Sequence, residues 1–348
     1  MPQPGTNADR RALAVASLAA VAILSAPMLR AQGREDLVEE TTFALQEALD
    51  RGKYDLAVGF GRRLVELEPK QVMPPYLLAR AYAGAGNADA AVEWLGTSAE
   101  LGFLYPSTLQ RDAEFDAVRE HSGFADAAAH IRKNSREALE RFKLKAERAT
   151  VLTIVPPDIE PTEPAPLIVA LHGYGTIAAN IAKPLRDIAA EARAILIAPQ
   201  AVDRVGRGFS WGVIEQAEYL ILRAIEKTRD EHNVDEQRVV ITGFSQGGHM
   251  SFLMGLRYPD RFAGVIPICG FYEHRLTPVP ETPTPGLPRF FIMNGANDAA
   301  ADNNRDAARR LKAIGAPVEL RLYDGVGHSL PQNPEPELRA ALRYVFGD

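Results

Sequence analysis

Short apolar runs alternate with longer amphipathic stretches from Leu167 to the end of the chain. A strand that helices cover on both faces is apolar throughout, whereas apolar positions recurring every 3.6 residues are typical of a helix. The alternation therefore predicts an α/β fold with a mostly parallel sheet and helices on both faces. Ligands bind beyond the carboxyl ends of such strands, so we expect the chemistry just after each run. The runs are 167–171, 194–198, 238–242, 263–268, 289–293 and 318–323.

Residues 40–102 show a different pattern, with apolar positions at helical spacing and an internal repeat. Gly52 and Gly86 are 34 positions apart, and Ala57 and Ala91 repeat the same offset. Glycine and asparagine separate the periodic stretches, where a helix–turn–helix unit needs its turns. The stretch resembles about two tetratricopeptide repeats, which are built on this period.

The domain boundaries follow from these two patterns. A helical segment at 109–124 would close the repeats, because repeat units cannot bury their faces alone, and we expect an all-α domain over 34–130. A charged stretch without proline or glycine then predicts a connecting helix, which with a first strand makes a linker over 131–166. The α/β core is expected over 167–348. The repeats either bind a protein partner or pack as an appendage on the next domain.

The first 31 residues have the features of a signal peptide. Arg10 and Arg11 give a positively charged start, and residues 12–26 are apolar apart from two serines. We expect cleavage after Ala31 and export to the periplasm or the medium. The apolar run is shorter than the roughly 20 residues of a membrane span, so no stable span is expected. An uncleaved membrane anchor is the alternative.

Composition and charge exclude several functional classes. The 348 residues are 46% hydrophobic and 24% charged, which is typical of a globular protein. The formal net charge of −6 argues against a nucleic-acid partner, which requires a basic surface. No nucleotide-binding loop or metal-ligand spacing occurs, so neither a cofactor nor a metal is predicted. The one cysteine, Cys269, cannot form an internal disulfide and is expected to be a small buried side chain.

The strongest chemical signal is the sequence Gly243-Phe244-Ser245-Gln246-Gly247. It lies between an apolar run and a stretch with helical spacing that ends at Pro259. A sharp strand-to-helix turn strains the backbone at the serine, and side chains two residues to either side would clash there. Such a turn exposes the hydroxyl at the end of the sheet. Ser245 is therefore the candidate nucleophile.

A serine hydroxyl needs a base to become nucleophilic, and where the serine lies in a Gly-x-Ser-x-Gly turn after a strand, the base comes last in the chain. Three histidines follow Ser245. His249 and His274 lie too early to leave room for an acid between nucleophile and base. His328 follows the last apolar run in a glycine-containing loop, and we assign it as the base.

The base in turn needs a carboxylate that orients its ring. Asp298 comes just after the apolar run 289–293 and is the candidate acid. Asp302 is the competitor, but its position suits the start of the following helix better. Asp324 is too near His328 in sequence to reach behind its ring.

Two backbone N–H groups are expected to bind an oxyanion. The Gln246 N–H lies at the start of the helix after the nucleophile. The second donor should come from the loop Leu171-His172-Gly173-Tyr174-Gly175, and we assign it to the Tyr174 N–H. His172 is expected to brace this loop rather than to transfer protons.

From Leu167 to the C-terminus the chain resembles the phospholipase/carboxylesterase branch of the α/β-hydrolases, with kinship to polyhydroxybutyrate-depolymerase-like esterases. This resemblance implies the α/β-hydrolase fold and a metal-free hydrolase of esters or thioesters. Asn294 departs from the pattern, because relatives commonly have histidine there. The motifs that carry the resemblance are 171–175, 198–201, 210–211, 243–248, 295–298 and 327–328.

Together these features predict a serine hydrolase that cleaves carboxylic esters or thioesters through an acyl-enzyme on Ser245. Its substrate would be a small-molecule or polymeric ester. A serine peptidase or acyltransferase using the same residues is the alternative. A repeat-based binding protein with an inactive hydrolase domain is a third reading, and an intact set of catalytic residues argues against it.

Overall fold

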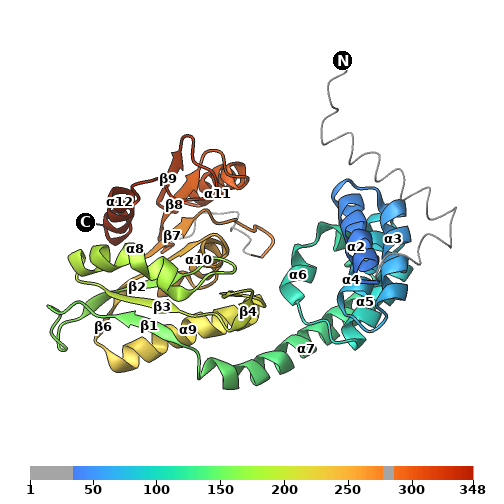
Figure 1. The fold of residues 1–348 in the computed structure, drawn as a ribbon, viewed down its shortest axis with the longest axis horizontal. Coiled ribbons are helices and arrows are strands. Elements are labelled where there is room, and N and C mark those ends of the chain that lie inside the picture. The colour runs from blue at the N-terminus through green and yellow to red at the C-terminus, as the bar shows by residue number, and fades with distance from the viewer. Residues whose placement is uncertain (1–33, 277–285, 348) are drawn as a thin grey trace, which may run out of the picture. The chain divides into compact units, whose positions relative to one another are not determined.

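A computed structural model describes residues 34–276 and 286–347 (Figure 1). The chain divides into two compact units, and the boundary between them falls between Arg136 and Glu137. The first unit is helical and the second is built on a β-sheet. The predicted signal peptide lies outside the described residues.

The first unit is a succession of short helices joined by tight turns. Gly52 and Gly86, the repeated glycines, have φ angles of 65° and 78°, a left-handed conformation that suits glycine at the end of a helix. The core between the helices contains small and aromatic side chains; the ring of Tyr76, for example, stacks at 4.2 Å on that of Phe103, which lies in a loop. The elements are α2 (Arg34–Asp50), α3 (Tyr54–Leu67), α4 (Met73–Gly84), α5 (Ala88–Glu100), α6 (Pro106–Arg111) and the 3₁₀-helix η2 (Ala113–Val118). The all-helical region is thus confirmed, whereas its identity as tetratricopeptide repeats stays a prediction.

The connecting helix α7 (Ser122–Ala146) begins nine residues earlier than the predicted charged helix and crosses the boundary between the units. Its end belongs to the second unit, where Phe142 and Ala146 are buried in the core. Leu139, one turn earlier in the same helix, packs against this core as well.

The second unit contains a seven-stranded sheet with the strand order β1-β3-β2-β6-β7-β8-β9. All neighbouring strands are parallel except β1 and β3, which pair antiparallel. Each predicted apolar run overlaps one of the parallel strands. The strands are β1 (Val151–Ile154), β2 (Ala165–Leu171), β3 (Ile195–Pro199), β6 (Val234–Phe244), β7 (Gly264–Ile268), β8 (Arg289–Gly295) and β9 (Val318–Tyr323).

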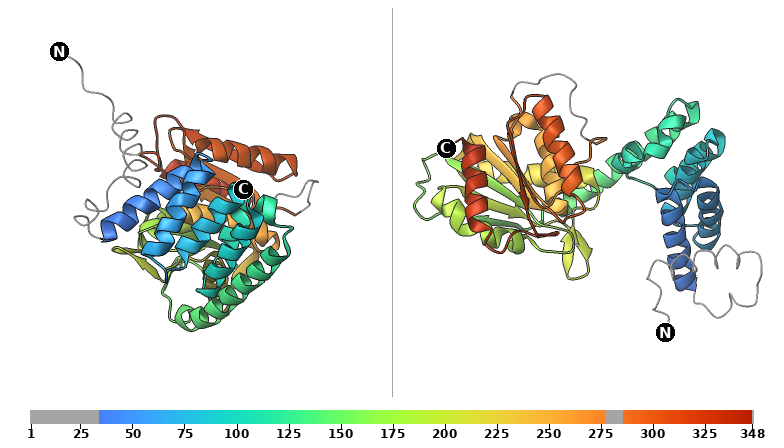
Figure 2. Two further views of the ribbon diagram at one scale, coloured as in Figure 1. Left: turned by 90° about the vertical axis from the view of Figure 1, so that its right-hand side faces the viewer. Right: turned by 90° about the horizontal axis from the view of Figure 1, so that it is seen from above.

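Helices cover both faces of this sheet, which confirms the predicted fold class (Figure 2). In β2, Leu167, Val169 and Leu171 face one core, and Ile168 and Ala170 face the other. Because both cores are apolar, the strand shows no polar alternation. One face is covered by α8 (Ala178–Glu191) and α12 (Glu335–Phe346). The other is covered by α9 (Ile214–Glu231), α10 (Gln246–Arg257) and α11 (Ala301–Ala313).

A small hairpin was not predicted from the sequence. It consists of β4 (Asp203–Val205) and β5 (Gly208–Ser210), which pair only with each other. Phe209 forms an isolated bridge with Thr176, so the hairpin lies beside the loop that follows β2. In the part of the chain that the structure describes, no helix has both the length and the apolar character needed to cross a membrane.

Candidate active site

Ser245 lies in the turn between β6 and α10, at the carboxyl end of the central strands. Its φ and ψ angles are 56° and −114°, a strained conformation for a residue with a side chain. The glycines on either side permit this turn: a Cβ at Gly243 would lie 2.4 Å from Gly247, and a Cβ at Gly247 would lie 2.1 Å from the Leu171 carbonyl oxygen. The close approach of three backbone segments therefore fixes the position of the hydroxyl.

His328 connects Ser245 with Asp298. Its Nε2 lies 2.8 Å from the Ser245 Oγ, and its Nδ1 lies 2.7 Å from an oxygen of Asp298. The carboxylate requires a donor, so Nδ1 carries the proton and Nε2 is free to accept the serine hydroxyl. The Asp298 side chain is 4% exposed and that of His328 is 52% exposed. The structure thus brings the three predicted residues into one hydrogen-bonded chain that ends at the surface.

The loops that carry Asp298 and His328 are tied to each other. Asn297 donates its backbone N–H to Val326 at 2.9 Å, and Ala300 donates its N–H to the Asp298 carboxylate at 2.9 Å. A Cβ at Gly295 would lie 2.1 Å from the Gly327 carbonyl oxygen, so only glycine permits this contact. The contact between the two loops sets the distance between acid and base.

The two predicted oxyanion donors come from two segments, Tyr174 from the loop after β2 and Gln246 from the start of α10. A Cβ at Gly173 would lie 3.5 Å from the Ser245 Cβ, so the loop that carries Tyr174 approaches the serine turn closely. Gln246 is the first residue of α10, where N–H groups have no partner within the helix. Within the described residues no hydrogen bond occupies the N–H of Tyr174 or of Gln246. Both groups are therefore available to an incoming anion.

The buried ring of His172 braces the loop that holds Tyr174. Its Nδ1 lies 2.8 Å from the Gly173 carbonyl, and its Nε2 accepts the Ala201 N–H at 3.2 Å. Burial lowers its pKa, so the ring is neutral and serves as donor and acceptor at once. Trp211 stacks on this ring and donates its indole N–H to the His172 carbonyl at 2.8 Å. Gln200 contacts the same Nε2, which gives a physical reason for the 198–201 and 210–211 motifs.

The competing histidines and acid have other surroundings. The His249 Nδ1 lies 2.7 Å from the Phe271 carbonyl, and His274 lies 3.8 Å from Glu273. Asp302 is in the first turn of α11, where its exposed carboxylate pairs with Arg305 at 2.6 Å. The Ser245 hydroxyl is hydrogen-bonded to His328, and the other nitrogen of His328 is hydrogen-bonded to Asp298.

Cys269 is buried as predicted, but it lies beside the same hydrogen-bonded chain. It follows β7, is 3% exposed and donates its thiol to the Ser329 carbonyl at 3.5 Å. Burial raises the pKa of the thiol to about 12, and the nearby Asp298 carboxylate adds to this shift. The thiol is therefore protonated and inert at neutral pH. The sequence could not indicate this neighbourhood, because three loops distant in sequence form it.

A cavity of about 380 Å³ opens above Ser245. Most of the surface that its lining residues expose is apolar, and none of them is a lysine or an arginine. The cavity therefore suits a neutral, apolar part of a substrate. Phe271, 49% exposed, is its largest apolar side chain. The lining residues are Ser245, Gln246, His249, Cys269, Phe271, Asp298, Ala299, Ala300 and His328.

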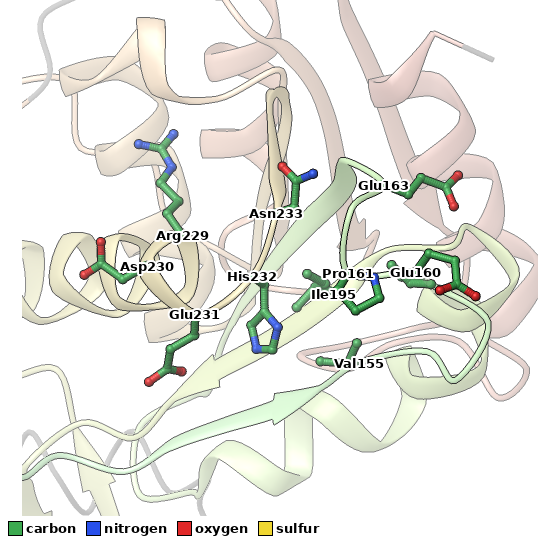
Figure 3. Close-up of a pocket in the computed structure, with 11 residues that line it drawn as sticks. Val155, Glu160, Pro161, Glu163, Ile195, Arg229, Asp230, Glu231, His232 and Asn233 are labelled. Atoms are coloured by element: carbon green, nitrogen blue, oxygen red, sulfur yellow. The ribbon is translucent and has the colours of Figure 1, made fainter.

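A second cavity, of about 400 Å³, lies at the opposite end of the sheet, near the start of β3 and β6 (Figure 3). The carboxylates of Glu160, Glu163, Asp230 and Glu231 point in different directions around it (Figure 3). No serine, threonine or cysteine is among its lining residues, so it offers no side-chain nucleophile of that kind. Ser245, Asp298 and His328 all line the other cavity, the one above Ser245.

Comparison with known proteins identifies a family for most of the second unit. The dienelactone hydrolase family matches residues 169–343, a range that contains all five predicted site residues. Over 115 residues the chain is 36% identical to poly(3-hydroxyalkanoate) depolymerase C of Paucimonas lemoignei, covering 30% of this chain and 28% of that protein. Over 112 residues it is 30% identical to acyl-protein thioesterase 1 of Gibberella zeae, covering 31% of this chain and 48% of that protein. The chain thus spans less than half the length of either relative.

Among solved structures, the carboxylesterase from Mesorhizobium loti is similar, with a TM-score of 0.47 and 18% sequence identity over 55% of this chain and 97% of that chain. The α/β-hydrolase resemblance inferred from the motifs is thus confirmed, through the fold and the family match. The finer assignment to the phospholipase/carboxylesterase branch stays a prediction.

Proposed function

The chain belongs to the dienelactone hydrolase family, and from this premise we propose that it hydrolyses carboxylic esters or thioesters through an acyl-enzyme on Ser245. The observation that carries the proposal is the position of His328, whose two ring nitrogens contact the Ser245 hydroxyl and the Asp298 carboxylate. The similarity to a depolymerase and to acyl-protein thioesterases supports an acyl substrate.

The geometry supports a two-step mechanism. Ser245 Oγ attacks the acyl carbon while its proton moves to the His328 Nε2. Asp298 holds the Nδ1–H and stabilises the positive charge that forms on the ring. The N–H groups of Tyr174 and Gln246 bind the oxygen that becomes negative.

When the tetrahedral intermediate collapses, the bond to the leaving group breaks and His328 donates its proton to the departing alkoxide or thiolate. Water then attacks the acyl-enzyme, with His328 again taking the proton. This second step releases the carboxylic acid and restores the Ser245 hydroxyl. Because His328 is 52% exposed, water has access to the ring from the cavity side.

Hydrolysis of p-nitrophenyl esters and of an acyl-thioester tests the proposal. Ser245→Ala and His328→Gln should each lower kcat by at least about 10³-fold, and Asp298→Asn by about 10⁴-fold. The matched controls are His274→Gln and Asp302→Asn, which change the same residue types outside the hydrogen-bonded chain and should retain activity. Full turnover by Ser245→Ala would contradict the proposal.

A further inference from the structure

Cys269 adds a third metal-binding side chain to the pair formed by Asp298 and His328. Its Sγ, a carboxylate oxygen of Asp298 and a ring nitrogen of His328 all lie within 4.8 Å of one another. The backbone at Cys269 has a φ of 49°, in the left-handed region that residues with a Cβ rarely adopt. Such strain persists where the surrounding structure holds a residue in place, and it is common at functional sites.

These three groups are the donors that zinc prefers. Zn²⁺ binds thiolate, imidazole and carboxylate, and sites with three protein ligands keep a fourth position for water. The sulfur favours Zn²⁺ and Cd²⁺ over Mg²⁺ and Ca²⁺, which prefer oxygen. Tetrahedral coordination places such ligand atoms about 3.4–3.6 Å apart. The His328 Nδ1 and the Asp298 oxygen, now 2.7 Å apart, must separate by somewhat under 1 Å to reach this spacing. The cavity above Ser245 gives a cation access, because all three residues line it.

We propose that Cys269, Asp298 and His328 bind a soft divalent cation, Zn²⁺ or Cd²⁺, which reversibly switches Ser245 off. On binding, the thiol loses one proton to water, and Sγ, a carboxylate oxygen and Nδ1 form bonds to the metal. The ring proton moves from Nδ1 to Nε2, so Nε2 donates a hydrogen bond and no longer accepts the proton of Ser245. Thiolate and carboxylate together carry two negative charges, which the cation neutralises.

The surroundings of the thiol fit this exchange. Burial and the Asp298 carboxylate raise the pKa of Cys269. A divalent cation offsets both causes, because its ligand bonds replace the missing solvation and its charge cancels that of the carboxylate. Without a cation the thiol stays protonated and leaves the hydrogen bond between Asp298 and His328 intact. The same three residues can thus serve two states, one active and one blocked.

Inhibition by Zn²⁺ tests the proposal on the full chain, purified without a histidine tag. The concentration giving half-maximal inhibition should rise at least about tenfold in Cys269→Ala, with each variant compared with its own rate in the absence of metal. Cys269→Ser, which nearly keeps the volume, should behave in the same way. His274→Ala removes a different histidine–carboxylate pair and should leave the inhibition unchanged. Chelation by EDTA should restore the rate.

Inhibition rests on the proposed function, whereas metal binding does not. Titration with Cd²⁺, followed by thiolate-to-metal absorption in the ultraviolet, should show one bound equivalent in the wild type and none in Cys269→Ala or Cys269→Ser. If the protein hydrolyses no ester, this titration still decides the metal site. Equal inhibition with and without the thiol, or no absorption band in the wild type, would overturn the proposal.

Discussion

Two buried side chains beside Ser245 are held in their neutral forms by the same physical cause. Removing a group from water disfavours its charged form, so burial lowers the pKa of the His172 ring and raises that of the Cys269 thiol. A neutral His172 can accept the Ala201 N–H while its other nitrogen contacts the Gly173 carbonyl. The conformation of the loop that carries Tyr174 therefore depends on the protonation state of one ring.

This dependence predicts how stability changes with pH. Burial lowers the pKa of His172 in the folded protein. Near and below pH about 6.5, the ordinary pKa of histidine, this residue therefore binds more protons in the unfolded chain than in the folded protein. The free energy of unfolding should therefore fall as the pH decreases from about 6.5, by up to about 1.4 kcal/mol per pH unit from this group. Urea unfolding of the wild type and of His172→Gln between pH 5 and 7.5 measures the difference. An identical slope in both proteins would exclude His172 as its source.

The sequence indicated individual residues where chain order and local context sufficed. Gly243, Gly247 and the following helix marked Ser245, and the apolar strands ahead of Asp298 and His328 placed both at the same edge of the sheet. The surroundings of Cys269 were beyond prediction, because they depend on how the loops after β8 and β9 fold against the end of β7. Asn294, which stands where relatives commonly have histidine, is buried, and its side-chain oxygen accepts a hydrogen bond from Asn304 at 3.1 Å.

At the scale of elements, the site depends on how closely the loops after β8 and β9 approach each other. Gly295 ends β8, and a Cβ there would meet the Gly327 carbonyl at 2.1 Å. Gly327 itself has no atom within 4 Å of its own Cβ position. Position 295 therefore has no room for a side chain, whereas position 327 has room for a methyl group, although both glycines lie near the acid and the base.

Replacing each glycine by alanine tests this contact. Gly295→Ala should push the loops apart by about 1 Å and lower kcat about 10²-fold, because catalysis depends on the position of the ring relative to Ser245. Gly327→Ala should have a much smaller effect, since its Cβ enters open space. Circular dichroism and thermal unfolding show whether each variant is folded. Equal activities of the two variants would argue against a role for the contact.

Regular elements were predicted where the pattern was long and apolar. The six apolar runs became parallel strands, and the amphipathic stretches became helices such as α9 and α11. The hairpin of β4 and β5 escaped prediction because each strand has only three residues and pairs outside the main sheet. The pairing direction of β1 was equally hidden, since its short sequence fits either direction at a sheet edge.

At the scale of the whole molecule, the two units have separate cores, and the five site residues all belong to the second unit. Leu139, Phe142 and Ala146 of α7 pack into the second core. A domain with its own core can fold alone. The function of the helical unit is therefore separable from that of the hydrolase by experiment.

A fragment of residues 137–348 should fold and hydrolyse esters within about threefold of the full chain, because it keeps the complete core. A fragment of residues 150–348 lacks Phe142 and Ala146 and should lose about 2–4 kcal/mol of stability from the exposed apolar surface. Ester hydrolysis and urea unfolding of the two fragments provide the comparison. Loss of activity in the longer fragment would show that the helical unit takes part in the reaction.

The most direct test of the central claim is labelling of the full chain with a fluorophosphonate, followed by mass mapping of the modified peptide. An activated serine should form one covalent adduct, located on Ser245, because its hydroxyl has the hydrogen-bonded base and the free N–H groups of Tyr174 and Gln246 are expected to bind the oxyanion. The adduct should be absent from Ser245→Ala and should form much more slowly in His328→Gln. An adduct on another residue, or equal labelling of wild type and Ser245→Ala, would contradict the assignment of Ser245 as the nucleophile.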